Sequence, residues 1–343
     1  MVDSLRFPAE WEPQSAVLIA WPHAGTDWAE RLPDVETTYV ALVAAITRFQ
    51  RTVVCVQDAA LRSHAEDMLA GAGVDLSKVR FETLPYNDTW LRDSGPITLR
   101  SSDGFHLLDF HFTAWGGKFE AGLDDRIVSE LHARGLFQRA ERERIHFALE
   151  GGAIETDGQG GLLSTWHCLH ERHPDSSREE ITAKLQDWLR QDRTLWLDHG
   201  YLEGDDTDAH IDTLARFAGP DAIVYQGCQD PLDSHYTELQ AMASELAAFG
   251  TREGKPYRLF ELPWAKPILD EGRRLAASYA NFLIVNGAVL MPAYGDAADA
   301  AAVEVLRLAF PDREIVAIPC RSLIWQNGSL HCITMQLPEG LVA

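Results

Sequence analysis

Short apolar runs bounded by turn residues recur along the whole chain and predict β-strands. The predicted strands span 16–21, 52–57, 79–84, 97–100, 107–112, 147–155, 194–197, 222–226, 258–262, 282–285, 288–292, 315–319 and 330–336. Between them, apolar residues recur at helical spacing and predict helices over 35–49, 61–70, 125–134, 178–190, 236–249 and 297–310. Strands and helices are interleaved from one end of the sequence to the other, so the pattern predicts a mixed α/β fold.

Two hairpins can be read directly in this pattern. Asn286-Gly287 joins two apolar runs as expected of a type I′ turn, and the glycine-rich segment 157–161 separates two further runs. A doubly wound parallel sheet contains few hairpins, so a repeated mixed α/β unit is favoured. Because no linker or low-complexity tract interrupts the sequence, we expect a single domain over residues 1–343.

The composition narrows the class of protein. The chain has 343 residues, of which 46% are hydrophobic, enough to bury a large core. Its 52 acidic and 30 basic residues give a formal net charge of -22, which argues against a nucleic acid as partner. Such a charge suits a small cationic ligand, although acidity can also serve solubility alone.

The first residues and the cysteines both indicate where the protein is located. Residues 1–14 lack the basic and apolar parts of a signal peptide, and no run of 18 apolar residues occurs, so no membrane association is expected. The five cysteines are an odd number without tight spacing, which indicates reduced thiols rather than a disulfide framework. Both observations predict a cytoplasmic protein.

Candidate chemistry centres on Cys332, which lies in the strand-like run 330–336. Four polar residues upstream, Asp93, Glu150, His210 and Asp212, stand in polar turns between apolar runs. If the fold brings all five together, they supply a nucleophile, a base and acids able to hold a cation. The alternative is that the cysteine is a small buried hydrophobe, as free cysteines usually are.

Two of the carboxylates follow predicted strands. Asp93 lies in the polar loop 87–96, where ligands often bind, although Arg92 could instead neutralise it in a structural turn. Glu150 follows an apolar run and precedes two glycines, which allow close approach of a backbone or a ligand. A solvated glutamate in a bulge is the alternative there.

The segment 209–212 supplies a histidine and a third carboxylate. If it is extended, His210 and Asp212 point to the same face and can act as an acid/base pair. The acidic residues at 205, 206 and 208 could instead form a calcium loop, but the glycine and distant glutamate of an EF-hand are out of register. His331 should point away from the sulfur of Cys332, which makes His210 the better candidate to activate it.

A second cluster raises the alternative of a metal-dependent hydrolase. His167, His170 and His173 recur at helical spacing around Cys168. Their directions diverge around a helix, and the usual pattern of two histidines enclosing a glutamate is absent. Residues on the surface or rim are therefore the favoured interpretation, and no metal is expected.

In order and content, the motifs resemble the agmatine deiminases and the Porphyromonas-type peptidylarginine deiminases of the guanidine-modifying superfamily. The resemblance is carried by PAEWEP at 8–13, AWP at 20–22, TWLRDSGP at 89–96, AWGG at 114–117, EGG at 150–152, DTDAHID at 206–212, SYANF at 278–282, GD at 295–296 and HCIT at 331–334. It covers essentially the whole chain. It implies a five-bladed α/β propeller, the pentein fold, with the active site on the central axis and no cofactor.

The resemblance also implies a role for each candidate residue. Cys332 would be the nucleophile, His210 the general acid/base and Glu150 the carboxylate that orients His210, whereas Asp93 and Asp212 would grip a guanidinium. The implied reaction is hydrolysis of agmatine to N-carbamoylputrescine and ammonia through a covalent S-amidino-cysteine, a step in putrescine and polyamine biosynthesis. Two carboxylates suit a guanidinium because that group is planar and permanently charged.

Several positions depart from the family pattern. Asp205 and Ala209 replace glycines, and residues 326–328 read Gln-Asn-Gly where three glycines are usual. The segment 165–169 has Trp-His where two glutamates are usual, and Met335 replaces a glutamine. None is among the five candidate catalytic residues, but all can reshape the substrate pocket.

Recognition of the rest of the substrate is less constrained. Trp90 and Trp115 are candidates to line the aliphatic chain or stack on the guanidinium, with core packing as the alternative, and Asp206 is a candidate for the far amine. Free arginine or a peptide ending in arginine would need a cation for its carboxylate, for which Arg92 is closest in sequence. A noncatalytic guanidinium-binding protein is a further alternative, and a homodimer is expected on general grounds only.

Overall fold

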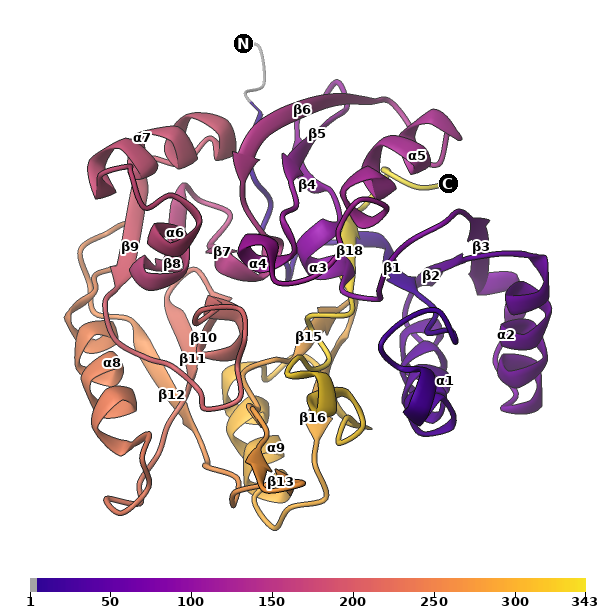
Figure 1. The fold of residues 1–343 in the computed structure, drawn as a ribbon. Coiled ribbons are helices and arrows are strands. Elements are labelled where there is room, and N and C mark those ends of the chain that lie inside the picture. Colours follow the sequence, from indigo (N-terminus) through magenta and orange to yellow (C-terminus); the bar gives the residue numbers. More distant parts are fainter. Residues whose placement is uncertain (1–4) are drawn as a thin grey trace.

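Five sheets of three or four strands encircle a central axis in the computed structural model, which describes residues 5–343 (Figure 1). The first blade contains β18 (Met335–Pro338), β1 (Gln14–Ala20), β2 (Arg51–Val56) and β3 (Val79–Thr83). The other blades, in chain order, are β4 (Ile97–Arg100), β5 (Phe105–His111) and β6 (Ala140–Ala148); β7 (Ile154–Thr156), β8 (Gly161–Thr165) and β9 (Arg193–Leu197); β10 (Ala215–Gly219), β11 (Ala222–Gln226) and β12 (Arg258–Leu262); and β15 (Leu283–Val285), β16 (Ala288–Ala293) and β17 (Glu314–Pro319). The expected five-bladed α/β propeller is confirmed.

All five blades share one connection pattern. The first two strands are antiparallel and the next pair is parallel, and the parallel crossover contains helix. The longer helices are α1 (Leu32–Thr47), α2 (Ala59–Gly71), α5 (Ile127–Ala133), α6 (Trp166–Arg172), α7 (Arg178–Leu189), α8 (Tyr236–Ala248) and α9 (Asp299–Ala309). Within residues 5–343, no helix combines the length and apolar character needed to cross a membrane. The last strand, β18, pairs with the first, β1, so the two ends of the chain close the ring (Figure 1).

Strand β1 shows why the sequence reads as continuous apolar runs. Every residue from 16 to 20 is fully buried, because both faces of the sheet are covered. Alternate side chains enter different cores: Val17 and Ile19 pack in one apolar cluster, whereas Leu18 packs in another. Burial of each such side chain contributes about 1.5–3 kcal/mol, so the blade depends on both clusters.

Both predicted hairpins are present, with one correction. The segment 157–161 connects β7 to β8, and Asn286-Gly287 connects β15 to β16. Only Gly287 has positive φ (79°), so the turn is not type I′, which needs positive φ at both positions. The side chain of Asn286 is hydrogen-bonded to the backbone N–H and C=O of Gln14 at 3.0 and 2.8 Å, which ties the turn to β1.

Two predicted strands are interrupted where the chain reaches the axis, and a segment considered as extended is not. The run 147–155 breaks at 149–153, between β6 and β7, and 209–212 is a loop leading into a 3-10 turn, Ile211–Thr213, instead of an extended segment. Residues 330–334 form a turn before β18, closed by bonds from the N–H and hydroxyl of Thr334 to the C=O of His331 at 3.0 and 2.9 Å. Each break occurs where backbone leaves the sheet to present polar side chains at the axis.

The elements that the pattern missed include β10, the first half of β6 and α6. Strand β10 carries Arg216, and the first half of β6 carries arginines and glutamates, which hides the strand signal. Helix α6 has only seven residues, too few for a helical period to show. In each case tertiary contacts, rather than local pattern, determine the element.

Candidate active site

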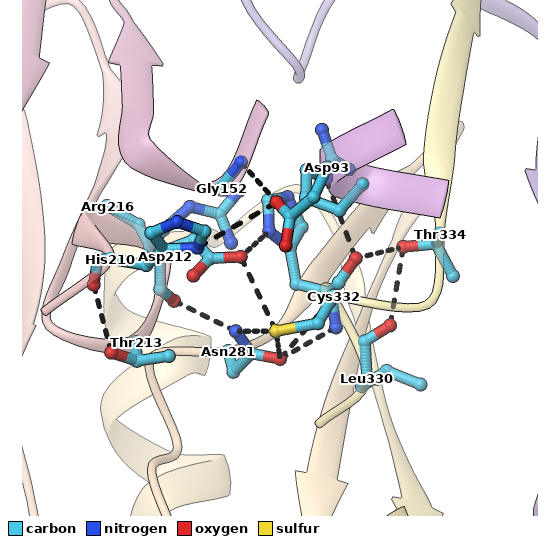
Figure 2. A network of polar contacts seen from close by, with 12 residues as sticks. Asp93, Gly152, His210, Asp212, Thr213, Arg216, Asn281, Leu330, Cys332 and Thr334 are labelled. Atoms are coloured by element: carbon cyan, nitrogen blue, oxygen red, sulfur yellow. Dashed lines mark hydrogen bonds and ion pairs between the residues drawn. The ribbon is translucent and has the colours of Figure 1, made fainter. Parts of the chain in front are cut away.

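The connections between neighbouring blades meet at the axis and bring polar residues together there (Figure 2). In blade order these residues are Asp93, Glu150, His210 with Asp212, Asn281 and Cys332. All six are 5% exposed or less. Five of them were selected from the sequence, and Asn281 was missed. No polar residue had been assigned to the connection between the fourth and fifth blades, and that gap could have pointed to Asn281.

The sulfur of Cys332 is surrounded by an amide and a carboxylate. Asn281 places Nδ2 at 3.3 Å and Oδ1 at 3.4 Å from Sγ, and Oδ2 of Asp212 is 3.7 Å away (Figure 2). The same Oδ1 accepts the N–H of His331 at 2.9 Å, which fixes the amide with its donor toward the sulfur. Burial, followed by the charges of Asp212 and Asp93, raises the pKa of Cys332 well above its ordinary value. The side chain of Cys332 is therefore a thiol in this structure.

Asp93 and Asp212 differ in how their oxygens are engaged. Asp93 accepts the N–H of Gly152 and the indole N–H of Trp115, both at 2.9 Å, and burial together with the charge of Asp212 raises the pKa of Asp93 to about 6. In Asp212, Oδ2 accepts a bond from Nδ1 of His331 at 2.7 Å, whereas Oδ1 has no hydrogen-bond partner among residues 5–343. Although burial raises it, the bond and charge of His331 leave the pKa of Asp212 below its ordinary value. A buried ionised oxygen without a partner is ready to accept an N–H donor.

His210 lies between two carboxylates without being hydrogen-bonded to either. Its Nδ1 is 3.8 Å from Oδ1 of Asp93 and its Nε2 is 3.6 Å from Oε2 of Glu150. In the described part of the chain, neither ring nitrogen has a hydrogen-bond partner. Burial alone would lower the pKa of His210, but Asp93, Cys168 and Glu150 outweigh it and raise that pKa well above its ordinary value. The ring is therefore a charged proton donor inside an acidic cage.

Arg172 holds Glu150 from behind. Its Nε donates to Oε1 of Glu150 at 2.8 Å and its Nη1 to Asp208 at 2.6 Å, and its side chain is 1% exposed. Arg172 and Cys168 are four residues apart on α6, so they share the helix face directed at His210 and Glu150. The histidines of this segment and its departure from the family pattern were noted in the sequence, but Arg172 was not. The missed signal is an arginine on the same face as a buried cysteine.

Gly152 allows the candidate catalytic groups to approach the backbone. A Cβ atom at this position would lie 2.6 Å from Nδ1 of His210, 2.8 Å from Oδ1 of Asp93 and 3.2 Å from Oδ2 of Asp212. No side chain fits in that space. The glycines after Glu150 were expected to allow a close approach to the backbone, and that approach occurs at Gly152.

The loop 205–209 contains two departures from the family pattern, and they contact each other. Asp208 and Ala209 have positive φ (65° and 70°), a conformation that costs a non-glycine residue about 1–2 kcal/mol. Asp205 accepts the N–H of Ala209 at 2.8 Å and the N–H and hydroxyl of Thr207 at 3.1 and 2.6 Å. These bonds hold the loop in shape. The carboxylates at 205 and 208 are thus engaged by N–H donors, which disfavours the calcium-loop alternative.

A cavity of about 590 Å³ opens above the sulfur, in the size range of small-molecule sites. Asp93 and Cys332 line it, and so do the three residues expected to bind the rest of the substrate, Trp90, Trp115 and Asp206. Both tryptophans also belong to the apolar core, at 6% and 8% exposure, so cavity lining and core packing apply together. Four more acidic residues line the cavity: Asp27, Asp88, Glu120 and Asp124. Burial raises the pKa of both Asp88 and Asp124 to about 7.

The cavity lining also includes a cation that the sequence analysis did not consider. Arg273 donates to Oδ1 of Asn327 and, at 2.6 Å, to the C=O of Trp325. The amide of Asn327 in turn donates to Oδ2 of Asp206 at 2.8 Å. Asn327, which replaces a family glycine, therefore bridges a carboxylate and a guanidinium across the cavity wall.

Arg92, the arginine suggested for a substrate carboxylate, is not part of this cavity. It is 4% exposed, donates to Gln336 at 2.6 Å and lies 3.8 Å from Glu10. It lines a separate cavity on the far side of the catalytic residues. The suggestion that Arg92 binds a substrate carboxylate is therefore wrong, because Arg92 and Asp93 point to opposite sides of the chain.

The histidines of α6 do not gather around one point. His170 stacks on Trp166 and His173 stacks on Phe147, whereas His167 is exposed. In residues 5–343, the clusters whose ligand atoms approach one another closely enough for a metal contain none of the three. The geometry therefore gives no support to the alternative of a metal-dependent hydrolase built on them.

Comparison with known proteins agrees with this arrangement. The sequence profile of the Porphyromonas-type peptidyl-arginine deiminase family matches residues 6–338. The agmatine deiminase of Stutzerimonas stutzeri is 33% identical over 99% of this chain and 97% of its own. The solved structure of a cysteine-to-serine variant of C. jejuni agmatine deiminase with substrate bound is 34% identical with a TM-score of 0.91, over 98% of this chain and 97% of that one. A Porphyromonas gingivalis protein, provisionally called an arginine deiminase, is 45% identical with a TM-score of 0.92, over 99% and 100% of the two chains. The chain belongs to the Porphyromonas-type peptidyl-arginine deiminase family.

Proposed function

We propose that this protein hydrolyses agmatine to N-carbamoylputrescine and ammonia. The observation that carries the proposal is the pair of buried carboxylates, Asp93 and Asp212, beside the thiol of Cys332 in an acidic cavity. A guanidinium presents N–H donors in one plane, so two carboxylates can hold its central carbon in front of the sulfur. The acidic cavity wall suits the second charge of agmatine, and the relative from Stutzerimonas stutzeri is itself named agmatine deiminase.

Substrate binding also prepares the nucleophile. The pKa of Cys332 is high in the empty site because burial and two carboxylates oppose a thiolate. A bound guanidinium neutralises those carboxylates, and the charged ring of His210 and the amide of Asn281 favour the thiolate further. The thiol proton then leaves the site and the sulfur attacks the guanidinium carbon.

His210 moves the protons of the two following steps. When the C–N bond breaks, the imidazolium gives its proton to the departing nitrogen, which leaves as ammonia, and the carbon remains bound to sulfur as an S-amidino group. Water then attacks that carbon and gives a proton to the neutral ring. When the C–S bond breaks, the remaining hydroxyl proton passes to the sulfur, so the carbamoyl product leaves and the thiol is restored. The proton that left Cys332 before the attack is then the one net proton released with neutral ammonia. Glu150, held by Arg172, keeps the ring in place.

The test is release of ammonia by the purified protein with agmatine, arginine or a peptide ending in arginine. We expect turnover of agmatine that Cys332→Ser abolishes and a chelator leaves unchanged. Release that survives the substitution would refute the covalent mechanism. Absence of release from all three substrates, with binding retained, would support the noncatalytic guanidinium-binding alternative.

A specific observation supports a second candidate, a guanidine that carries a carboxylate, such as arginine. Arg273 lines the same cavity, and its hydrogen-bond acceptors are an amide and a backbone carbonyl rather than a carboxylate. The related protein of Porphyromonas gingivalis is provisionally called an arginine deiminase. If arginine is turned over, Arg273→Gln should raise the KM for arginine about tenfold and change that for agmatine little. Equal effects on both substrates would exclude this role.

The remaining expectations are proposals of the same kind. The chain would act as a single catalytic domain over 1–343, because connections from all five blades contribute to one site. The five cysteines are free and buried, which suits a reducing cytoplasm. The proposed reaction needs no cofactor, and a homodimer stays a prediction.

A further inference from the structure

His331 lies directly behind one of the two carboxylates expected to hold the guanidinium, and the reaction described above does not use it. Its ring is 1% exposed. Nδ1 is 2.7 Å from Oδ2 of Asp212, and Nε2 is 2.8 Å from Oε2 of Glu10. The ring therefore links a residue at the start of the chain to the catalytic centre, across 321 positions of sequence.

Glu10 is held firmly at the far end of this link. Its Oε1 accepts the N–H of Ile284 at 2.7 Å, and its Oε2 accepts Nη2 of Arg216 at 2.8 Å. Arg216 is itself fully buried and donates to the C=O of Phe282 at 2.6 Å. Although burial raises it, Arg216 and His331 hold the pKa of Glu10 well below its ordinary value. Glu10 is thus a fixed anion.

The two contacts of the ring require two donors. A neutral imidazole has one N–H, so it would direct a lone pair at a carboxylate oxygen less than 3 Å away. Burial, with Arg216 and Arg92 nearby, lowers the pKa of His331, whereas the hydrogen bonds to Asp212 and Glu10 favour the charged form. Both bonds have the length of a charge-assisted N–H···O contact, so the geometry favours the imidazolium.

The link acts on the part of Asp212 that the substrate needs. With Oδ2 bonded to His331, the rotation of the carboxylate is fixed and Oδ1 is left without a partner in the described chain. Six charged or titratable groups surround this carboxylate: His331, His210, Arg216, Cys332, Asp93 and Arg92. Of these, His331 makes the shortest hydrogen bond to it, at 2.7 Å, compared with 3.7 Å for Sγ of Cys332.

We propose that His331, clamped by Glu10, is the positioning residue that orients Asp212 and keeps it ionised, so that the substrate guanidinium meets a preformed acceptor. The inference rests on the proposed deiminase function, because it assigns Asp212 to the guanidinium. It adds two residues, Glu10 and His331, whose effect on the reaction passes entirely through another side chain.

Two amide substitutions separate this role from a merely structural one. The amide nitrogen of asparagine can replace Nδ1 of histidine, and that of glutamine can replace Nε2. His331→Asn thus keeps the donor to Asp212 and loses the one to Glu10, whereas His331→Gln does the reverse. We expect His331→Gln to weaken agmatine binding at least tenfold and His331→Asn to weaken it no more than about threefold. Dissociation constants are measured calorimetrically in a Cys332→Ser background, where no turnover interferes.

The pH profile provides the second readout. Without the cation beside it, buried Asp212 should take up a proton at higher pH, so the acidic limb of kcat/KM should shift upward in His331→Gln. Glu10→Gln keeps the shape of the clamp but removes its charge, and it should shift the limb in the same direction. The Glu10→Gln variant also tests the proposal if the His331 variants do not fold.

A matched control is available in His235, which is also 1% exposed and also has a partner on each ring nitrogen, Asp233 and the N–H of Glu203. His235→Gln should leave agmatine binding and the pH profile unchanged. Equal losses in the asparagine and glutamine variants of His331, or an unshifted acidic limb in both His331→Gln and Glu10→Gln, would overturn the positioning role. Failure of the wild-type protein to act on agmatine would instead refute the proposed function, and the same variants would then be compared on the guanidine that the wild type does convert.

Discussion

Two groups of buried ionisable residues lie on opposite sides of the axis, and they differ in how their carboxylates are neutralised. The front set is Asp93, Glu150, His210, Asp212 and Cys332, of which Asp93 and Cys332 line the acidic cavity. The rear cluster, on the other side, is Glu10, Arg92, Glu155, Arg216 and His331. Consecutive residues divide between them: Arg92 and Asp93, and His331 and Cys332.

The rear cluster contains its own guanidinium. Arg216, fully buried, donates Nη2 to Glu10 and Nε to Glu155, and it lies over the ring of Phe282 at 4.8 Å. In the front set, Asp93 lies 3.8 Å from the ring of His210 and Asp212 is bonded to His331, but no guanidinium of the described chain is hydrogen-bonded to both carboxylates. The rear cluster therefore resembles the complex proposed for the front set. The difference teaches that the front pair keeps an oxygen, Oδ1 of Asp212, available for a guanidinium from outside, whereas the rear pair already holds one that belongs to the protein.

The largest effect should come from removing the internal guanidinium. Arg216→Met leaves Glu10 and Glu155 buried without their cation, which should lower the free energy of unfolding by about 3–5 kcal/mol. Urea denaturation measures this. Arg258→Met is the control, because that arginine pairs with Asp221 on the surface at 59% exposure and should cost no more than about 1 kcal/mol. Similar losses in the two variants would contradict the comparison.

In the front set, the backbone leaves no room for a methyl group. Gly152→Ala places Cβ 2.6 Å from His210 and 2.8 Å from Asp93, so these groups must move apart. Because displacements of about 1 Å cost roughly 100-fold in rate, kcat/KM for agmatine should fall by about that factor. Gly71→Ala, at a site with no atom within 4 Å of the new Cβ, should leave kcat/KM unchanged. A Gly152→Ala enzyme within threefold of wild type would show that the site tolerates displacement.

Acidification should separate activity from stability. Asp93 grips a cation only when ionised, so with a pKa of about 6 the value of kcat/KM should fall about tenfold for each pH unit below that. In the unfolded chain an aspartate has a pKa of about 3.9, so the folded state takes up this proton first on acidification. The contribution of Asp93 therefore raises the free energy of unfolding as the pH falls from about 7 to 4, by roughly 1–3 kcal/mol.

This prediction is checked by comparing wild type with Asp93→Asn, which lacks the titrating group. The difference in unfolding free energy between the two proteins should change in favour of wild type as the pH is lowered. A difference that is constant with pH, together with an acidic limb of activity well below pH 5, would show that the buried carboxylate titrates normally.

The smallest effect concerns the donor that Asp93 already has. Trp115→Phe keeps most of the ring but removes the indole N–H that donates to Asp93 at 2.9 Å. The pKa of Asp93 should rise further, which moves the acidic limb upward by a fraction of a pH unit and lowers kcat/KM a few-fold at pH 7. A gain in kcat/KM would instead mean that the indole competes with the substrate for this oxygen.

The sequence predicts which residues form the front set much better than it predicts how they are arranged. Apolar runs such as 97–100, 222–226 and 258–262 are strands with those same boundaries, because a buried strand leaves a continuous local signal. The propeller itself was expected from the resemblance rather than from periodicity. His210 and Asp212 were expected to share a face if the segment 209–212 were extended, yet they converge from a loop and a 3-10 turn.

The rear cluster and Asn281 escaped prediction for a physical reason. Asn281 meets Cys332 across 51 positions of sequence, and Glu10 meets His331 across 321. No local pattern reports such contacts, since each partner stands in an ordinary segment. Arg273 was missed for the same reason. Its place in the cavity wall depends on Asn327 and on the short strand β14 (Arg273–Arg274), which follows the fourth blade.

The loop 205–209 constrains how this protein can have diverged from its relatives. An alanine at position 209 is held in a left-handed conformation by the side chain of Asp205, where glycines are usual at both positions. The two positions are therefore energetically coupled, because the cost of alanine at 209 depends on which residue stands at 205.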